Sequence, residues 1–291
     1  MTQTSAVGFI GLGVMGEPMC RNLARKISAR VIAFDVRQEP LARLRAEGVE
    51  PAASVGEIVA KAETLMLSLP SGAEVAAVCG GEEGIIARSK AGQTVIDLGT
   101  SPVKLTRSLA QQFARKGVEF ADAPVARTRA AAEAGTLSVM VGASEKIFRR
   151  IEPLLKTFAT EITHCGNVGA GQLTKILNNM VLFETGVALA EALALARRSG
   201  LDPALLLTTL SKGSADSFAL RNHGMKAMLP DTFPERAFSA QYALKDLGYA
   251  LECAGDVGLK LSGAELARAL LQRVIARGLG GQYWPVIAKV V

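Results

Sequence analysis

The feature that most constrains the fold lies near the start of the chain, where three glycines separate two apolar runs. Residues 7–10 form a short apolar run, Gly11-Leu-Gly-Val-Met-Gly16 follows directly, and residues 17–25 have the spacing of an amphipathic helix. A second apolar run, residues 30–34, ends at Asp35. A strand, a Gly-x-Gly-x-x-Gly turn, a helix, a strand and an acid within about 30 residues indicate a dinucleotide-binding unit.

Each glycine of this turn has its own physical role. Gly11 permits the tight turn, Gly13 lets the backbone approach a pyrophosphate, and Gly16 lets the helix pack close to the sheet. The N-terminus of the helix then presents unpaired N–H groups to the phosphates. We therefore expect the cofactor to contact the whole turn, which consists of Gly11, Leu12, Gly13, Val14, Met15 and Gly16.

The acid at the end of the second strand bears on the choice between NAD and NADP. Asp35 can accept hydrogen bonds from the adenosine ribose hydroxyls and would repel a 2′-phosphate, which favours NAD. Arg37 lies two residues further on and could accommodate that phosphate, so NADP stays open as the alternative cofactor.

Further strands and helices alternate along the next hundred residues. Alternation of this kind predicts an open, mostly parallel, doubly wound sheet covered by helices on both faces. Ligands of such sheets bind at the carboxyl ends of the strands. We therefore expect Leu69, Pro70 and Thr100 to contact the nicotinamide half of the cofactor. The strand-like runs are residues 64–69, 94–98, 118–122 and 137–141.

The pattern changes after Gly166, because no strand-like run follows residue 172. Residues 172–198 have helical spacing, and Gly200 is a plausible stop. A helix of about 27 residues would be roughly 40 Å long, which suggests the spine of an all-α domain that also packs against another subunit. We therefore predict a cofactor domain at residues 1–166 and a helical substrate and oligomerisation domain at residues 167–291.

Composition excludes several classes of protein. The net charge is +6, but the basic residues are dispersed and aromatics make up only 5%, so nucleic acid is not the expected partner. The positive charge fits an anionic small molecule as the partner instead. Four cysteines and two histidines are scattered without metal-ligand spacing, so neither zinc nor a disulfide is expected. No apolar run reaches the length of a membrane span, and no signal peptide is recognisable, so we expect a cytoplasmic protein without a membrane partner.

A glycine-rich stretch from Gly166 to Asn179 lies where the strands stop and the helices begin. Glycines there allow a ligand to approach the backbone closely. Lys175 and Asn179 follow them four residues apart, so one ammonium and one amide project from the same helix face. We expect this stretch to be both the reacting centre and the seam between the two domains.

Four separated segments carry a specific resemblance: residues 8–19, Asp122-Ala-Pro-Val125 with Gly135-Thr-Leu137, Gly169–Lys175 with Asn178 and Asn179, and Lys245-Asp-Leu247. In these segments the chain resembles the β-hydroxyacid dehydrogenase family, which includes 3-hydroxyisobutyrate dehydrogenases and tartronate semialdehyde reductases. The resemblance implies a Rossmann domain joined by a long helix to an all-α domain, in homodimers or homotetramers. It also implies reversible hydride transfer between NAD(P) and the hydroxyl carbon of a short β-hydroxy acid.

Hydride transfer changes the charge on the substrate oxygen, so a proton donor or cation must lie beside it. Lys175 is the candidate general acid and base, and Asn179 would orient the substrate, with Asn178 as its rival. Lys245 is expected near cofactor or substrate, and an ion pair with a neighbouring acid is its alternative. Phe238 would either wall the substrate pocket or belong to the core.

The expected substrate loop departs from the family pattern. The family usually has Ser-Gly-Gly after Asp-Ala-Pro-Val, whereas this chain has Ala126, Arg127 and Thr128, which we expect to bind the substrate. An arginine there suits a bulkier or more charged oxyanion, and the loop is similar to that of sulfolactaldehyde reductases. Ordinary carboxylates and a three-carbon sulfonate aldehyde both stay open. The alternative is that Arg127 faces solvent or pairs with an acid such as Glu133.

Two other functions share this architecture. Imine reductases, which would use NADP, typically lack the lysine at the position matched by Lys175. Non-catalytic cofactor-binding scaffolds also tend to lose that lysine and carry additional reading modules. Because the chain has Lys175 and no such module is recognisable, the sequence favours a dehydrogenase over both.

Overall fold

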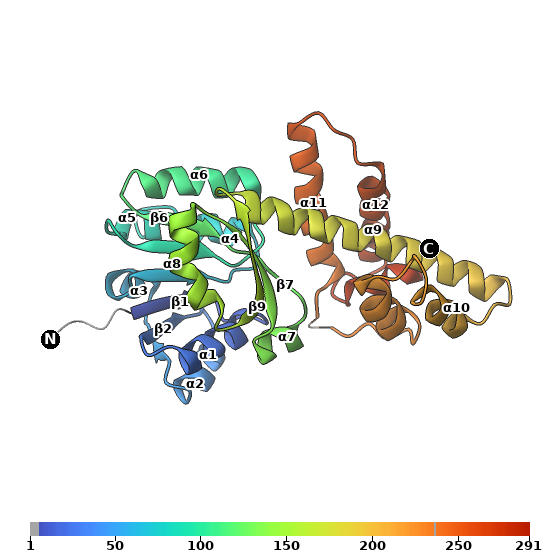
Figure 1. Cartoon of the computed structure of the whole chain (residues 1–291), viewed down its shortest axis with the longest axis horizontal. Coiled ribbons are helices and arrows are strands. Elements are labelled where there is room, and N and C mark those ends of the chain that lie inside the picture. The colour runs from blue at the N-terminus through green and yellow to red at the C-terminus, as the bar shows by residue number, and fades with distance from the viewer. Residues whose placement is uncertain (1–5, 236) are drawn as a thin grey trace. The chain divides into compact units, whose positions relative to one another are not determined.

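The computed structural model describes residues 6–235 and 237–291, and the chain divides into two compact units (Figure 1). The first unit ends at Lys175, and the second extends from Ile176 to Val291. The boundary falls nine residues beyond the predicted one at residue 166. It lies inside the helix α9 (Ala170–Arg198), whose first turns therefore belong to the first unit.

The first unit is built on one sheet with the strand order β3-β2-β1-β4-β5-β6-β8-β7, and β9 pairs with β8. The neighbours from β3 to β6 are parallel, β8 is antiparallel to β6 and β7, and β9 is parallel to β8. The strand order reverses between β1 and β4, which is where doubly wound sheets bind ligands. The strands are β1 (Ala6–Ile10), β2 (Arg30–Phe34), β3 (Glu50–Pro51), β4 (Thr64–Leu67), β5 (Thr94–Asp97), β6 (Glu119–Asp122), β7 (Val125–Ala126), β8 (Leu137–Gly142) and β9 (Ala159–Gly166).

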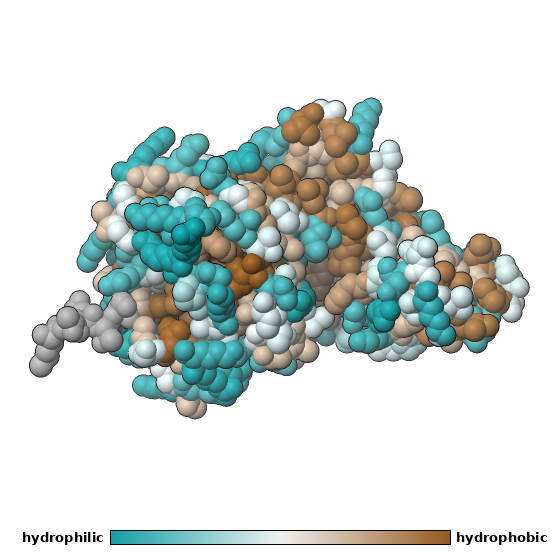
Figure 2. All heavy atoms as spheres, in the orientation of Figure 1, coloured by the Kyte–Doolittle hydropathy of each residue, from teal (hydrophilic) through white to brown (hydrophobic). Residues whose placement is uncertain are grey.

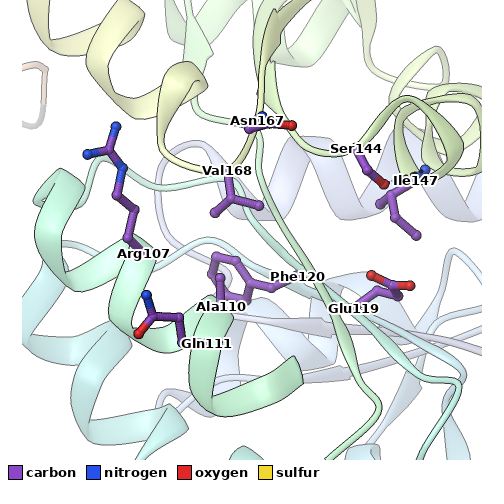
Figure 3. Close-up of a pocket in the computed structure, with 9 residues that line it drawn as sticks. All are labelled: Arg107, Ala110, Gln111, Glu119, Phe120, Ser144, Ile147, Asn167 and Val168. Atoms are coloured by element: carbon purple, nitrogen blue, oxygen red, sulfur yellow. Dashed lines mark hydrogen bonds between the residues drawn. The ribbon is translucent and has the colours of Figure 1, made fainter. Parts of the chain in front are cut away.

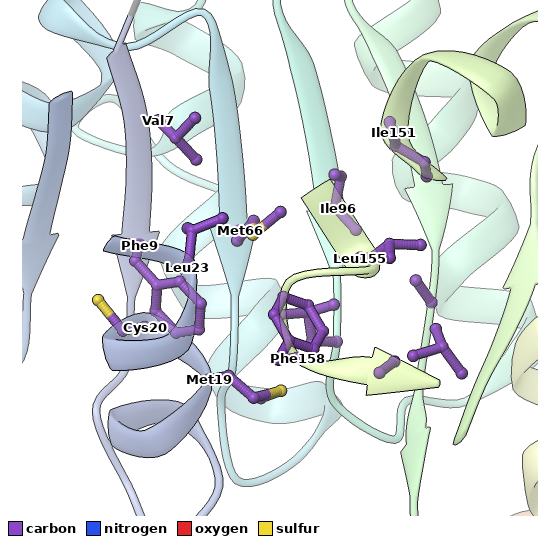
Figure 4. Close-up of a cluster of buried hydrophobic side chains, with 14 of the residues drawn as sticks. Val7, Phe9, Met19, Cys20, Leu23, Met66, Ile96, Ile151, Leu155 and Phe158 are labelled. Atoms are coloured by element: carbon purple, nitrogen blue, oxygen red, sulfur yellow. The ribbon is translucent and has the colours of Figure 1, made fainter. Parts of the chain in front are cut away.

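Helices cover both faces of this sheet because successive strand residues point to opposite sides. Phe9 and Met66 pack with α1, α2, α7 and α8, and Figure 4 shows them beside Met19 and Leu23. The next residue of β1, Ile10, belongs to a second core formed with α3 to α6. The helices are α1 (Gly16–Lys26), α2 (Gln38–Arg45), α3 (Val55–Lys61), α4 (Gly72–Cys79), α5 (Ile85–Arg88), α6 (Val103–Ala114), α7 (Arg129–Ala134) and α8 (Glu145–Leu155).

The second unit is helical and has a core of its own. Trp284 is fully buried at its centre, with its ring 5.2 Å from that of Phe183 in an edge-on arrangement. Gly186 is needed beside it, because a Cβ there would lie 2.4 Å from the indole. The elements after α9 are α10 (Pro203–Leu210), the π-helix η1 (Leu220–Met228), α11 (Ala240–Asp256), α12 (Ser262–Ala276) and the 3-10 helix η2 (Trp284–Lys289).

The predicted fold class, a doubly wound parallel sheet followed by an all-α region, is confirmed. Several elements were not predicted, namely β3, β7, β9 and α7. Within the described residues α9 alone has the length and hydropathy of a membrane span, but 44% of its most apolar window is buried inside the molecule. Core helices of globular proteins have the same properties.

Candidate functional site

The glycine turn after β1 has the shape expected of a phosphate cradle. Gly11 has a φ of +92°, and a Cβ on it would lie 2.4 Å from the carbonyl oxygen of Ser68. At Gly13 no heavy atom lies within 4 Å of the position that a Cβ would take, so the backbone is accessible there. A Cβ at Gly16 would lie 2.1 Å from the carbonyl oxygen of Gly11. Gly16 is therefore required by the turn itself, and not by the packing of the helix against the sheet that we expected.

Asp35 at the end of β2 is already held against this turn. Its carboxylate accepts hydrogen bonds from the N–H of Leu12 at 2.6 Å and from the N–H of Arg37 at 2.8 Å. The Arg37 side chain donates to the same carboxylate at 3.2 Å and to the carbonyl of Leu12 at 3.0 Å. Burial alone would raise the pKa of Asp35, but these hydrogen bonds outweigh it and hold the pKa below its ordinary value. The group is therefore an anion, suited to accept ribose hydroxyls.

The loops after β4 and β5 lie at the same edge of the sheet, because β1, β4 and β5 are parallel neighbours. Leu69 and Thr100 are half-buried there and Pro70 is exposed, and a Cβ on Gly99 would lie 3.0 Å from the carbonyl oxygen of Leu69. The structure thus brings the predicted cofactor residues of the first unit together at one sheet edge, whereas Lys245 belongs to the second unit. A glycine cradle, a carboxylate and two loops in this order fit a nicotinamide dinucleotide.

Helix α9 starts at the same edge and is anchored by a buried acid. Asp122, the last residue of β6, accepts hydrogen bonds from the N–H groups of Gly169 and Gln172, both at 2.7 Å. Burial raises the pKa of Asp122 to about 6, although these N–H groups oppose the shift. Lys175 follows in the next turn and is only 9% exposed. The sequence stretch around Asp122 was singled out, but its anchoring role was not predicted.

In the second unit the residues predicted to bind substrate meet at one carboxylate. Asn179 is buried and donates through Nδ2 to Asp246 at 2.7 Å, while Asn178 is exposed and donates to the Asn179 side chain at 3.1 Å. The ammonium of Lys245 lies 3.2 Å from the other oxygen of Asp246. Asp246 was not predicted as a site residue, although the Lys245-Asp-Leu247 motif was the signal that could have found it.

Aromatic rings surround Lys245. Its Nζ lies 5.2 Å from the ring centroid of Tyr242 and 5.5 Å from that of Tyr249. Phe238 is half-buried and stacks between Phe183 and Tyr242, with centroids 6.0 and 6.4 Å away. The ring therefore packs on the core and also contacts Tyr242 beside Lys245, and its place in the wall of a substrate pocket stays a prediction.

The substrate loop has an unusual backbone at its arginine. Arg127 has a φ of +87°, a conformation that non-glycine residues seldom adopt. Its guanidinium is exposed and donates to the carbonyl of Thr136 at 2.6 Å and to the hydroxyl of Thr160 at 3.3 Å. It does not pair with Glu133, which binds Arg129 at 2.8 Å.

The neighbours of Arg127 have different roles in the structure. Thr128 caps α7 by accepting from the N–H of Ala131, a role that differs from the predicted substrate contact. Ala126 is 9% exposed and pairs with Ser138 in the ladder between β7 and β8. The structure therefore leaves Arg127 as the member of this loop that presents its side chain to solvent with ionic hydrogen-bond donors.

A pocket in the first unit lies away from these residues. It is formed by α6, β6, the start of α8 and the segment before α9 (Figure 3). None of the predicted site residues lines it. Among the described residues, no group of three or more His, Cys, Asp and Glu side chains is placed to hold a metal ion. The lining residues are Arg107, Ala110, Gln111, Glu119, Phe120, Ser144, Ile147, Asn167 and Val168.

Comparison with known families covers nearly the whole chain. Residues 6–166 match the family described as the NAD binding domain of 6-phosphogluconate dehydrogenase. Residues 169–290 match the family described as NAD-binding of NADP-dependent 3-hydroxyisobutyrate dehydrogenase.

Two named relatives are similar over nearly their full length. The chain is 34% identical over 290 residues to 2-(hydroxymethyl)glutarate dehydrogenase of Eubacterium barkeri, which covers 100% of this chain and 96% of the relative. It is 36% identical over 272 residues to 3-hydroxyisobutyrate dehydrogenase of Pseudomonas aeruginosa, covering 91% and 90% of the two chains.

Solved structures separate close from distant relationships. The structure of 3-hydroxyisobutyrate dehydrogenase from Mycobacterium tuberculosis with L-serine has a TM-score of 0.88 at 30% identity and covers 98% of both chains. An imine reductase from Pseudomonas sp. has a TM-score of 0.63 at 16% identity and covers 99% of both chains, which shows a shared fold alone.

Proposed function

This chain belongs to the 3-hydroxyisobutyrate dehydrogenase family of hydroxyacid dehydrogenases, and from that premise we propose that it oxidises a short β-hydroxy acid, or reduces its semialdehyde, with Lys175 as general acid and base. The observation that carries the proposal is the place of Lys175. Lys175 is buried on α9, about one turn after the N–H groups of Gly169 and Gln172, which donate to Asp122. These groups lie at the carboxyl ends of the parallel strands, the same sheet edge that carries the glycine turn.

The chemistry assigned to the chain is proton transfer. The nicotinamide cofactor, when bound, accepts the hydride from the hydroxyl carbon or returns it to the carbonyl carbon. In oxidation the Lys175 amine takes the hydroxyl proton as the C–O bond becomes a carbonyl; in reduction the ammonium returns that proton to the forming alkoxide. Asn179 would hold the substrate by hydrogen bonds, and Asp246 fixes the orientation of its amide.

For the cofactor we propose NAD, with NADP as the alternative. The anionic Asp35 beside the glycine turn supports NAD, because a 2′-phosphate would be repelled there. The second family match is described as NADP-dependent, and Arg37 next to Asp35 supplies the cation that such an enzyme would use.

The names of the relatives indicate a common substrate frame. 3-Hydroxyisobutyrate and 2-(hydroxymethyl)glutarate both carry a hydroxymethyl group on the carbon that bears a carboxylate, and L-serine has the same frame. We propose this frame for the substrate of this chain, with a three-carbon sulfonate aldehyde, whose sulfonate lies one carbon further from the reacting centre, as the variant that the exposed Arg127 supports. Imine reductases share only the fold, so reduction of imines is not proposed.

Replacing Lys175 tests the proposal. Initial rates would be measured for a panel of 3-hydroxyisobutyrate, 2-(hydroxymethyl)glutarate, glycerate, 4-hydroxybutyrate and sulfolactaldehyde. Lys175→Ala should lower turnover of the best substrate by about 10²- to 10⁴-fold while NADH still binds, because only the proton-transfer group is lost. Lys61→Ala, which changes an exposed lysine of the same unit, is the control. Near-normal turnover by Lys175→Ala would reject the assignment.

A further inference from the structure

The side chain of Gln172 joins the start of α9 to the loop after β5. It is fully buried, its Oε1 accepts from the N–H of Ser101 at 3.0 Å, and its Nε2 donates to the carbonyl of Gly99 at 2.9 Å. The same Nε2 lies 3.4 Å from the carboxylate of Asp97, the last residue of β5. Thr100, the expected nicotinamide contact, lies between the two residues that Gln172 holds.

The backbone around Gln172 is held from the neighbouring strand. Its own N–H donates to Asp122, which also accepts from Gly169, and Asp122 stands directly opposite Asp97 in the ladder between β5 and β6. Ser101 completes the network by donating its hydroxyl to Asp97 at 2.7 Å. One buried network therefore joins the cofactor loop, the strand that leads into the substrate loop, and the first turn of α9.

We propose that Gln172 and Asp122 are positioning residues that fix Lys175 relative to the nicotinamide loop. Gln172 precedes Lys175 by three residues, so the two are neighbours on the surface of one helix. A shift of the first turn of α9 would move the lysine by a similar distance. Misplacement of a reacting group by about 1 Å can cost a factor of about 100 in rate. The inference rests on the proposed role of Lys175.

Buried amides also stabilise proteins without any part in catalysis, and the chain contains a matched example. Gln93 is buried in the same unit and donates through Nε2 to the carbonyls of Val59 and Ala62, both at 2.7 Å. It precedes β5, whereas Gln172 acts beyond the opposite end of that strand. Removing either amide leaves backbone groups buried without partners, so both changes should lower stability. Gln172 alone should affect the chemical step.

The experiment compares Gln172→Leu with Gln93→Leu in the full-length protein, using NAD and the best hydroxy acid of the panel. Gln172→Leu should lower kcat at saturating concentrations by about 10- to 100-fold, with a smaller change in KM. Gln93→Leu should lower the melting temperature comparably and leave kcat unchanged. Equal kcat values for the two folded variants would overturn the inference.

If Gln172→Leu does not fold, Gln172→Glu is the variant that tests the positioning role. A glutamate keeps the acceptor for Ser101 and, once protonated, can again donate toward Gly99 or Asp97. Its kcat relative to the wild type should therefore rise as the pH falls, and a ratio independent of pH would contradict the inference. If Lys175→Ala keeps its activity, the proposed function fails; if it is inactive while both Gln172 variants turn over normally, only the positioning role fails.

Discussion

At the scale of single residues, the cofactor choice depends on a carboxylate that is already bound by a neighbouring arginine. Asp35 and Arg37 form a pair beside Leu12, so the anion that favours NAD and the cation that would tolerate NADP occupy one place. The two hydrogen bonds from the backbone N–H groups of Leu12 and Arg37 fix the carboxylate independently of the arginine side chain. The carboxylate should therefore decide the preference.

We expect the wild type to use NAD better than NADP and Asp35→Asn to narrow that preference. The variant loses an ionic hydrogen bond to the ribose of NAD and the repulsion toward the 2′-phosphate of NADP. The ratio of kcat/KM with NAD to kcat/KM with NADP should therefore fall roughly 10- to 100-fold. Arg37→Ala, the companion variant, should lower use of NADP and leave use of NAD largely intact. Initial rates with both cofactors measure this, and a clear NADP preference of the wild type would show that Arg37 dominates.

Arg127→Gly removes the charge of the substrate loop at a position whose backbone glycine can adopt. Relief of the penalty of about 1 kcal/mol for a left-handed residue at φ +87° offsets part of the loss of the hydrogen bonds that the guanidinium donates to Thr136 and Thr160. Loss of the guanidinium should raise KM for anionic substrates, most for sulfonates. Arg129→Ala, which breaks the pair with Glu133, is the control. Unchanged KM values across the panel would refute anion binding by Arg127.

At the scale of elements, the π-helix η1 places a histidine in the apolar core of the second unit. Burial lowers the pKa of His223 to about 4, and its Nδ1 lies 2.6 Å from the hydroxyl of Tyr283, whose own pKa burial raises to about 12. The tyrosine therefore donates to a neutral imidazole. The Nε2 atom has no hydrogen-bond partner among the described residues.

The depressed pKa predicts an acid-sensitive stability. Below about pH 6.5 the unfolded chain binds a proton at this histidine, whereas the folded chain binds it only near pH 4. The contribution of His223 to stability should therefore fall as the pH falls through this window. The loss would be at most about 3 kcal/mol. Asp122 acts in the opposite sense, because its raised pKa of about 6 makes the folded state the better proton binder. Because the two groups oppose each other in the wild type, the free energy of unfolding of His223→Asn, measured with denaturant, should rise relative to that of the wild type as the pH falls from about 6.5 to about 4. A difference between the two proteins that is independent of pH would contradict this account.

The elements that the sequence pattern predicted are those with a strong apolar period. The parallel strands from β1 to β6 and the long helix α9 carry such runs, with the two-residue strand β3 as the exception. Strand β9 was missed because its sequence, Ala159-Thr-Glu-Ile-Thr-His-Cys-Gly166, is mostly polar and only its first residue is buried. Pairing with β8, rather than an apolar pattern, makes it a strand. Helix α7 was taken as loop, although Thr128 and Gly135 are ordinary caps for it.

The parts of the site that are continuous in the sequence could be predicted, and those that join distant residues could not. The glycine turn and the Lys175 stretch are continuous motifs, so sequence spacing reveals them. The contacts of Gln172 with Ser101 and Asp97 and of Asn179 with Asp246 each join residues about 70 positions apart. Nothing in the spacing of one chain predicts such pairs, because tertiary folding alone brings them together.

At the scale of the whole molecule, α9 carries an exposed stripe that the chain does not cover by itself. Val181 and Leu195 are 56% and 67% exposed, and with Thr174 and Ala188 they form a row in which every member follows the last by seven residues. Leu177 lies beside this row and is 40% exposed. Hydrophobic residues are also visible on the surface around α9 and α11 in Figure 2. A seven-residue spacing is that of helices packed along one another, so we propose that a second copy of the chain covers the stripe in a homodimer or homotetramer.

Charges on the stripe should therefore break the assembly. The double variant Val181→Glu and Leu195→Glu would bury two unpaired carboxylates in each copy of the interface, which costs several kcal/mol and should shift sedimentation equilibrium toward the monomer. Leu266→Glu, at a 49% exposed leucine of α12 outside the stripe, is the matched control and should leave the mass unchanged. The proposal would be wrong if the wild-type protein is monomeric at micromolar concentration or if the double variant keeps the wild-type mass. Either result would mean that another partner, or solvent alone, contacts this face of α9.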